Sequence, residues 1–255
     1  MRTTIKRTVV VPDLQIPLHD SVSVNNVISF IKAYKPDSVL TLGDEADFTE
    51  IGRWSEGRPG WYEQTLAENR DLTVETLWRL GEYAKEQHMI RSNHTDRLFT
   101  VIMNKIPAFM SLPELKFERF MQLEELGITY HKKPYMVAKG ILAVHGDEGS
   151  VKPTPGLTAL ESARRAGFST ICGHTHRAGF SQFSESSGGK ITRIIRGWEG
   201  GHLMDIRQAT YTKTHNWQQA FIIIEEDAKG SQISIINLEK DGTFIVHGKR
   251  YGRPR

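Results

Sequence analysis

The 255-residue chain contains a single cysteine, Cys172, and no run of eighteen consecutive apolar residues. One cysteine excludes an intramolecular disulfide and is typical of a reducing, cytoplasmic environment. Because no long apolar run exists, the sequence predicts no membrane-spanning helix. The apolar stretch from Thr8 to Val11 ends at Pro12 and is too short for a secretory signal. We therefore expect a cytoplasmic protein without a membrane partner, in which Cys172 is a small buried apolar side chain.

The sequence also has no strong charge bias, no internal repeat and no low-complexity linker. Its net charge is +3 at pH 7, which by itself does not indicate nucleic-acid binding. Apolar residues make up 38% of the chain, which is enough for one large hydrophobic core at this length. We predict a single domain over residues 1–248, followed by a basic tail at 249–255.

Strand and helix patterns alternate in the first two thirds of the chain. Buried-strand patterns at 7–11 and 38–42 flank a helical pattern at 20–34, which predicts two parallel strands joined by a right-handed crossover. After residue 178, short strands alternate with turns instead. The fold class is therefore α/β, with two mixed β-sheets packed face to face and flanked by helices. Further helices are expected at 63–87, 98–105, 113–126 and 158–167.

Five predicted strands end in clusters of Asp, Asn, Gln or His side chains. One such cluster is common on ordinary surfaces, whereas five in one chain favour a shared site at the carboxyl ends of the strands. Carboxylates, imidazoles and amide oxygens together suit two divalent cations such as manganese, iron or zinc rather than calcium. Two ions about 3.5–4 Å apart can assist the displacement at a phosphoryl group. The clusters are Asp13/Gln15, Asp44/Asp47, Asn93/His94, His145 and His174/His176.

The order of these motifs is D-x-[HQ], G-D-x-x-D, N-H, H-G-D and G-H-T-H over residues 8–178. This order resembles the calcineurin-like metallophosphoesterase superfamily and, more narrowly, its small members encoded by actinobacterial phages. The resemblance implies a four-layer αββα sandwich and a metal-dependent phosphoric ester hydrolase with a binuclear centre. It implies that one ion is held by Asp13, Asp44 and His176, and the other by Asp44, Asn93, His145 and His174.

The resemblance also assigns a catalytic pair. His94 matches the histidine that donates a proton to the leaving oxygen or stabilises the phosphoryl transition state, and Asp47 would orient it. A water that bridges the two ions would be the nucleophile, because two cations lower its pKa.

The chain departs from the family pattern at two positions. Gln15 replaces a histidine; its amide oxygen is a neutral ligand, so we predict a weaker, more exchangeable first metal site. Manganese is the favoured metal, with iron, zinc, nickel and magnesium as alternatives. Ser92 replaces the usual glycine before Asn93-His94 and is small enough to keep the turn. For Arg91, contact with substrate phosphate and exposure to solvent remain equal interpretations.

The segment 48–62 is rich in aromatic and arginine side chains and follows the Asp44/Asp47 cluster. Trp54 could stack on a nucleobase and Arg53 could bind phosphate, although simple packing of the loop is an equal interpretation. The first hypothesis is a phosphodiesterase of small nucleotides, including 2′,3′-cyclic ones. The alternatives are a metal-dependent DNA or RNA nuclease and a non-catalytic nucleotide- or partner-binding module with a decayed first metal site. A surface loop is favoured for 210–217, and the sequence leaves the oligomeric state open.

Overall fold

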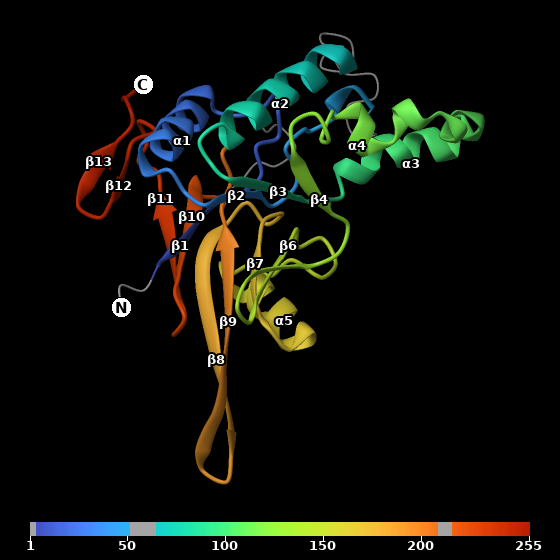
Figure 1. Ribbon diagram of the computed structural model, residues 1–255. Coiled ribbons are helices and arrows are strands. Elements are labelled where there is room, and N and C mark those ends of the chain that lie inside the picture. Colours follow the sequence, from blue (N-terminus) through green and yellow to red (C-terminus); the bar gives the residue numbers. More distant parts are fainter. Residues whose placement is uncertain (1–3, 52–64, 209–215) are drawn as a thin grey trace.

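The computed structural model describes residues 4–51, 65–208 and 216–255, and two β-sheets lie at its centre (Figure 1). In spatial order, the strands of the first sheet are β11 (Ser231–Asn237), β10 (Ala220–Glu226), β1 (Lys6–Val11), β2 (Ser38–Thr41), β3 (Glu86–Ile90) and β4 (Ile128–His131). Strands β1 to β4 are parallel, whereas β10 runs antiparallel to both β1 and β11. The sheet is therefore mixed, with its parallel strands ending at one edge.

The second sheet is also mixed. Its strands, in spatial order, are β5 (Tyr135–Ala138), β6 (Ile141–Val144), β7 (Ser169–Cys172), β9 (Lys190–Gly200) and β8 (Ala178–Ser187). Strands β6, β7 and β9 are parallel, and β5 and β8 are antiparallel neighbours at the two edges. Strands β8 and β9 extend well beyond the rest of the sheet as a projecting hairpin (Figure 1).

The buried side chains of the strands explain why the two sheets pack face to face. Along β1, Val10 joins a core cluster that contains Leu40 of the same sheet and Ala143 and Ile171 of the second sheet. Its neighbour Val9 points the other way and joins a cluster with helical residues. This alternation follows from the two-residue period of a strand, and it makes both faces of the central strands apolar.

Helices cover the outer faces of both sheets. Helix α1 (Ser21–Tyr34) is preceded by the N-cap residue Asp20, whose carboxylate accepts hydrogen bonds from the backbone of the first turn. The helix buries Phe30 against the first sheet. Helix α2 (Leu66–Gly81) buries Leu77 beside β3 and α4 (Phe117–Phe120), and α3 (Thr95–Lys105) lies near them. Helix α5 (Leu157–Ala166) packs on the second sheet. The predicted fold class, with two sheets between outer helices, is therefore confirmed.

Several predicted boundaries are wrong. The helix expected at 113–126 is broken into a 3-10 turn, the four-residue α4 and further turns, and the left-handed backbone of Gln122 (φ 53°) interrupts it. The helix expected at 63–87 ends earlier, at Gly81, and β3 begins at Glu86, within the range predicted to be helical. The structure also contains short 3-10 helices, among them η1 (Thr49–Ile51), η3 (Pro107–Ser111) and η4 (Pro113–Leu115).

The basic segment at 249–255 takes part in a small hairpin. Strand β13 (Lys249–Tyr251) pairs with β12 (Phe244–Val246), and the backbone of Arg253 donates to the side chain of Asn26 on α1. Cys172 is fully buried beside Val144, as the sequence predicts. None of the helices within the described residues has the length and apolar character needed to cross a bilayer.

Candidate metal centre

The turn after β2 places Asp44 at the junction of the two sheets. Gly43 has φ 94°, and a Cβ there would lie 2.5 Å from Cβ of Ser92 and 2.8 Å from Nδ1 of His145. Asp44 follows with φ 54°. Its backbone N–H donates to Oγ of Ser92 at 3.0 Å, and the same oxygen accepts from Thr95 N at 3.1 Å. The turn before Asn93-His94 thus forms with Ser92 in place of glycine, as expected. The Ser92 hydroxyl also links the segments that follow β2 and β3.

One group of donor atoms gathers around His145, which follows β6. Nε2 of His145 lies 3.3 Å from Oδ1 of Asp44, 3.2 Å from Nδ1 of His174 and 2.8 Å from Oδ1 of Asn93. The other ring nitrogen, Nδ1, is 2.7 Å from the carbonyl oxygen of Leu42. A proton on Nδ1 that is donated to this carbonyl leaves the lone pair of Nε2 directed at the group, which is how metal-binding histidines are usually oriented.

The electrostatics of this group favour a cation. Burial by itself would lower the pKa of His145, but the adjacent carboxylate of Asp44 raises it to about 10. Burial by itself would raise the pKa of Asp44, yet the charges of His145 and His94 hold it well below its usual range. The buried carboxylate of Asp44 is thus stabilised by positive charge beside it, which a metal ion could also supply.

A second group joins Asp13, Asp44 and His176, whose donor atoms lie within 4.8 Å of one another. Within the described residues, Oδ2 of Asp13 is buried and accepts no hydrogen bond, although Nε2 of His176 lies 3.1 Å away. Gln15 donates from Nε2 to Oδ2 of Asp44 at 2.9 Å, which leaves its Oε1 buried and unpaired. Gly173 is required here because a Cβ would lie 2.4 Å from Oδ1 of Asp13. Buried acceptors without donors are costly unless a cation satisfies them.

Each of the two groups could hold a divalent cation, and Asp44 belongs to both. The His145 group contains Asp44, His145 and His174, and the Asp13 group contains Asp13, Asp44 and His176. Adjacent ligands of an octahedral ion with bonds near 2.1 Å lie about 3 Å apart, which is the spacing of the pairs above. The mixture of nitrogen and oxygen donors suits transition metals better than calcium. The sequence resemblance assigned these residues to two ions in the same groupings, with Asn93 added to the His145 group, and their binding of metal stays a prediction.

The predicted catalytic pair lies at the edge of these groups, at the start of α3. Nε2 of His94 is 3.7 Å from Oδ2 of Asp44, and its Nδ1 is 3.5 Å from Oδ1 of Asp47. Nδ1 is buried without a hydrogen-bond partner. Catalytic hydrogen bonds are often long before substrate binds, so the arrangement is compatible with an acid and its orienting carboxylate.

Two residues at the centre were absent from the sequence prediction. Arg97 places Nη2 2.7 Å from Nε2 of His94, and only its i, i+3 spacing from His94 on α3 could have indicated this contact. Glu199 is fully buried and accepts from Oγ1 of Thr175 at 2.8 Å and from the backbone N–H of Thr158 at 2.9 Å. Thr175 separates the two histidines of G-H-T-H, so Glu199 fixes that loop to the start of α5.

The predicted substrate contacts have different surroundings. Arg91 donates to both carboxylate oxygens of Asp147 at 2.7 and 2.9 Å and to Asp96 at 2.8 Å, and its contact with phosphate stays a prediction. Arg53 and Trp54 lie outside the described residues. Trp217, for which a surface loop was favoured, packs edge-on against the ring of His176 at 4.7 Å between centroids.

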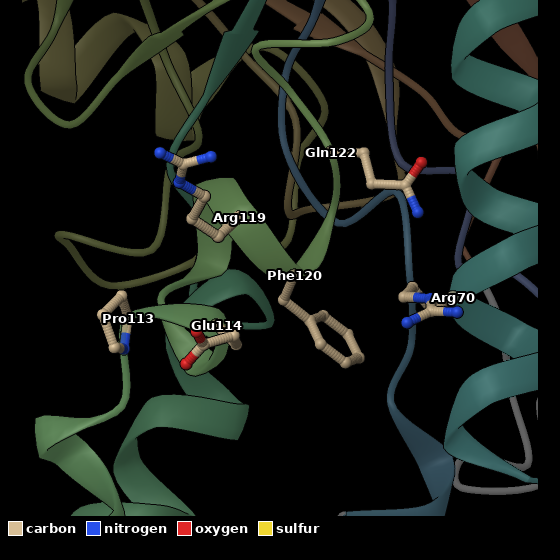
Figure 2. A pocket seen from close by; sticks show the side chains of 6 residues that line it. All are labelled: Arg70, Pro113, Glu114, Arg119, Phe120 and Gln122. Carbon is tan, nitrogen blue, oxygen red and sulfur yellow. The ribbon is translucent and has the colours of Figure 1, made fainter.

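A cavity of about 480 Å³ between α2 and α4 is separate from the metal-binding candidates (Figure 2). The ring centroids of Phe120 and Phe48 are 6.3 Å apart, and Phe48 follows Asp47 in the chain. None of its lining residues is a predicted site residue. They are Arg70, Pro113, Glu114, Arg119, Phe120 and Gln122.

Comparisons with known proteins give relatives that match over almost the whole chain and solved structures that are more distant. The chain is 30% identical over 250 residues to the Gene 54 protein of Mycobacterium phage D29, which covers 95% of this chain and 97% of that protein. Among solved structures, Vps29 of Chaetomium thermophilum is 14% identical with a TM-score of 0.49, over 98% of this chain and 100% of that chain. The phosphoesterase YfcE of E. coli is 13% identical with a TM-score of 0.42, over 94% of this chain and 97% of that chain. No family model matches.

The two-sheet architecture and the two donor groups that share Asp44 define a mixed α/β protein with candidate metal-binding residues. The chain belongs to the family of the mycobacteriophage Gene 54 proteins.

The group of Asp13, Asp44 and His176, next to which Gln15 lies, leads to the first prediction. We expect dialysis against a chelator to remove the ion of this group before that of the His145 group, because Gln15 offers only a neutral amide oxygen. The variant Gln15→His supplies an imidazole and should retain the ion. Elemental analysis after dialysis measures both proteins. Full retention of two ions by the wild type would show that Gln15 does not weaken the site.

The contacts of Glu199 generate the second prediction. Replacing Glu199 with Ala releases Thr175 and should lower manganese affinity by about 10–100-fold, since supporting contacts of this kind orient the ligands. Competition with a fluorescent chelator measures the affinity, and circular dichroism establishes folding. If Glu199→Ala is unfolded, Glu199→Gln is measured in its place. The control is Glu185→Ala, at an exposed carboxylate on β8. Equal affinities of the Glu199 and Glu185 variants would contradict the role.

Proposed function

We propose that this protein is a phosphodiesterase that depends on two divalent metal ions, with manganese preferred, and acts on small nucleotides. The observation that carries the proposal is the position of Asp44 in both donor groups, with His94 3.7 Å from the same carboxylate. Two cations bound there would supply Lewis acidity and lower the pKa of a shared water so that it can attack phosphorus. The remaining requirements fall on side chains of this chain.

His94 and Asp47 meet the requirement for an acid. His94 is held by α3 at the edge of both donor groups, where it can protonate a leaving oxygen through Nε2. Asp47, 3.5 Å from Nδ1, stabilises the positive charge that a protonated ring carries. No covalent bond between substrate and protein is needed, because water is the nucleophile.

Trp217 supports a substrate that carries a nucleobase. Its half-buried indole packs edge-on against His176, whose Nε2 lies 3.1 Å from Oδ2 of Asp13. An indole offers a flat apolar face on which any base can stack, and each such contact contributes about 1–3 kcal/mol. A phosphodiester of a nucleoside could therefore place its phosphate at the donor groups and its base against this ring.

The third prediction is a pattern of substrates. Manganese-loaded protein should hydrolyse bis-p-nitrophenyl phosphate and 2′,3′-cyclic AMP without cleaving single- or double-stranded DNA. Chelator should abolish turnover and manganese should restore it. His94→Ala should lower kcat by about 10²–10⁴-fold, the usual contribution of a general acid. Dominant strand cleavage would favour a nuclease, and no turnover of any substrate would favour the non-catalytic binding module.

The fourth prediction concerns Trp217. Trp217→Ala should raise KM for 2′,3′-cyclic AMP by about fivefold or more, because the loss of one stacked base costs at least about 1 kcal/mol, and should leave KM for bis-p-nitrophenyl phosphate less affected. Steady-state kinetics with both substrates measures the two changes. The control is Trp78→Ala, at an exposed indole on α2. An equal rise for both substrates would refute base stacking on Trp217.

A further inference from the structure

Arg97 is a cation that touches the candidate catalytic acid, and among the described residues its only recorded carboxylate partner is the distant Asp47. Its Nη2 is 2.7 Å from Nε2 of His94, and its Nη1 donates to the backbone carbonyl of Asp47. The nearest carboxylate oxygen in its recorded ion pair, Oδ1 of Asp47, is 3.9 Å away. Both of its close acceptors are therefore uncharged groups, and its side chain is 23% exposed.

The neighbouring Arg91 shows the opposite situation. Its guanidinium donates to both oxygens of Asp147 and to Asp96, all between 2.7 and 2.9 Å. Two carboxylates thus neutralise Arg91 at close range. A guanidinium that is partly desolvated and lacks such a partner favours an anion, and its planar fork fits two oxygens of a phosphate.

The contact between Arg97 and His94 cannot persist while His94 acts as an acid. A guanidinium has only donors, so it needs the lone pair of Nε2. The same nitrogen must carry the proton that a leaving oxygen receives. Arg97 therefore has to give up Nε2 during the reaction, and it needs another acceptor at the same edge of the centre.

We propose that Arg97 is a substrate-binding residue whose guanidinium transfers from Nε2 of His94 to a non-bridging oxygen of the bound phosphoryl group. The proposal rests on the proposed function and adds a residue to it. An anionic oxygen at this position accepts from Nη2 and frees Nε2 for the leaving oxygen. Substrate binding thereby couples the recognition of phosphate to the release of the acid.

The fifth prediction uses chemical rescue. Arg97→Ala should lower kcat/KM for bis-p-nitrophenyl phosphate by about 10²-fold, the effect of removing one donor from a transition state. Guanidinium at concentrations far below denaturing ones should restore part of the rate, because it can fill the space of the missing side chain. Urea has the same shape without the charge and should restore none. The control is Arg119→Ala, at an exposed arginine of the α2–α4 cavity, which should keep wild-type kcat/KM.

A binding measurement separates this proposal from the proposed function. Titration calorimetry of manganese-loaded protein with orthophosphate should show at least about tenfold weaker binding for Arg97→Ala, since a charge-assisted hydrogen bond contributes about 1.5–3 kcal/mol. Metal content should be unchanged. If the wild type hydrolyses no ester but binds phosphate through Arg97, the proposal stands and the diesterase function fails. Unchanged phosphate affinity, or equal rescue by urea and guanidinium, would overturn the role of Arg97.

Discussion

The buried carboxylate of Asp44 is the constraint on which the rest of the centre depends. It is 2% exposed, and a buried charge is tolerated only when partners surround it. Gln15 donates to one oxygen, the backbone N–H of His94 lies 3.3 Å from the other, and His145 lies 3.3 Å from that same oxygen. These partners follow β1, β3 and β6. The relative position of the two sheets is therefore tied to the neutralisation of one carboxylate.

The backbone is strained at several of the residues that carry the candidate metal-ligand atoms. Four non-glycine residues of the donor clusters have left-handed φ values: Gln15, Asp44, His174 and His176, at 54°, 54°, 61° and 56°. Such conformations cost about 1–3 kcal/mol each and persist when the surrounding structure determines them. The strands stop just before these residues, so their side chains turn inward instead of continuing the alternation of a sheet. A fold selected for stability alone would gain nothing from four such turns, which supports a functional role for the cluster.

The sequence could predict what depends on short-range pattern. Apolar runs such as Val9–Val11 mark buried strands, and the polar residues after them converge because parallel strands end at one edge. It could not predict contacts between distant segments. The tie from Glu199 to Thr175 and the hydroxyl of Ser92 beneath Asp44 depend on the final packing of the two sheets. The helix expected at 113–126 failed for a related reason, because its apolar residues pack in a short turn against Phe48 rather than along one helical face.

The charge of the centre limits what it can bind. Its donor groups hold two carboxylates, Asp13 and Asp44, while the imidazole, asparagine and glutamine ligands are neutral when they bind a metal. Two divalent cations would therefore leave an excess of two positive charges in a buried setting, where electrostatic interactions are strong. Asp47 and Arg97 carry opposite charges, so together they leave this count unchanged, although their nearest charged atoms are 3.9 Å apart. A hydroxide together with a singly charged diester balances this excess, whereas a dianionic monoester with hydroxide exceeds it by one. The donor count thus supports the proposed preference for diesters, and an additional acidic ligand in place of Gln15 would reduce that attraction for any phosphate.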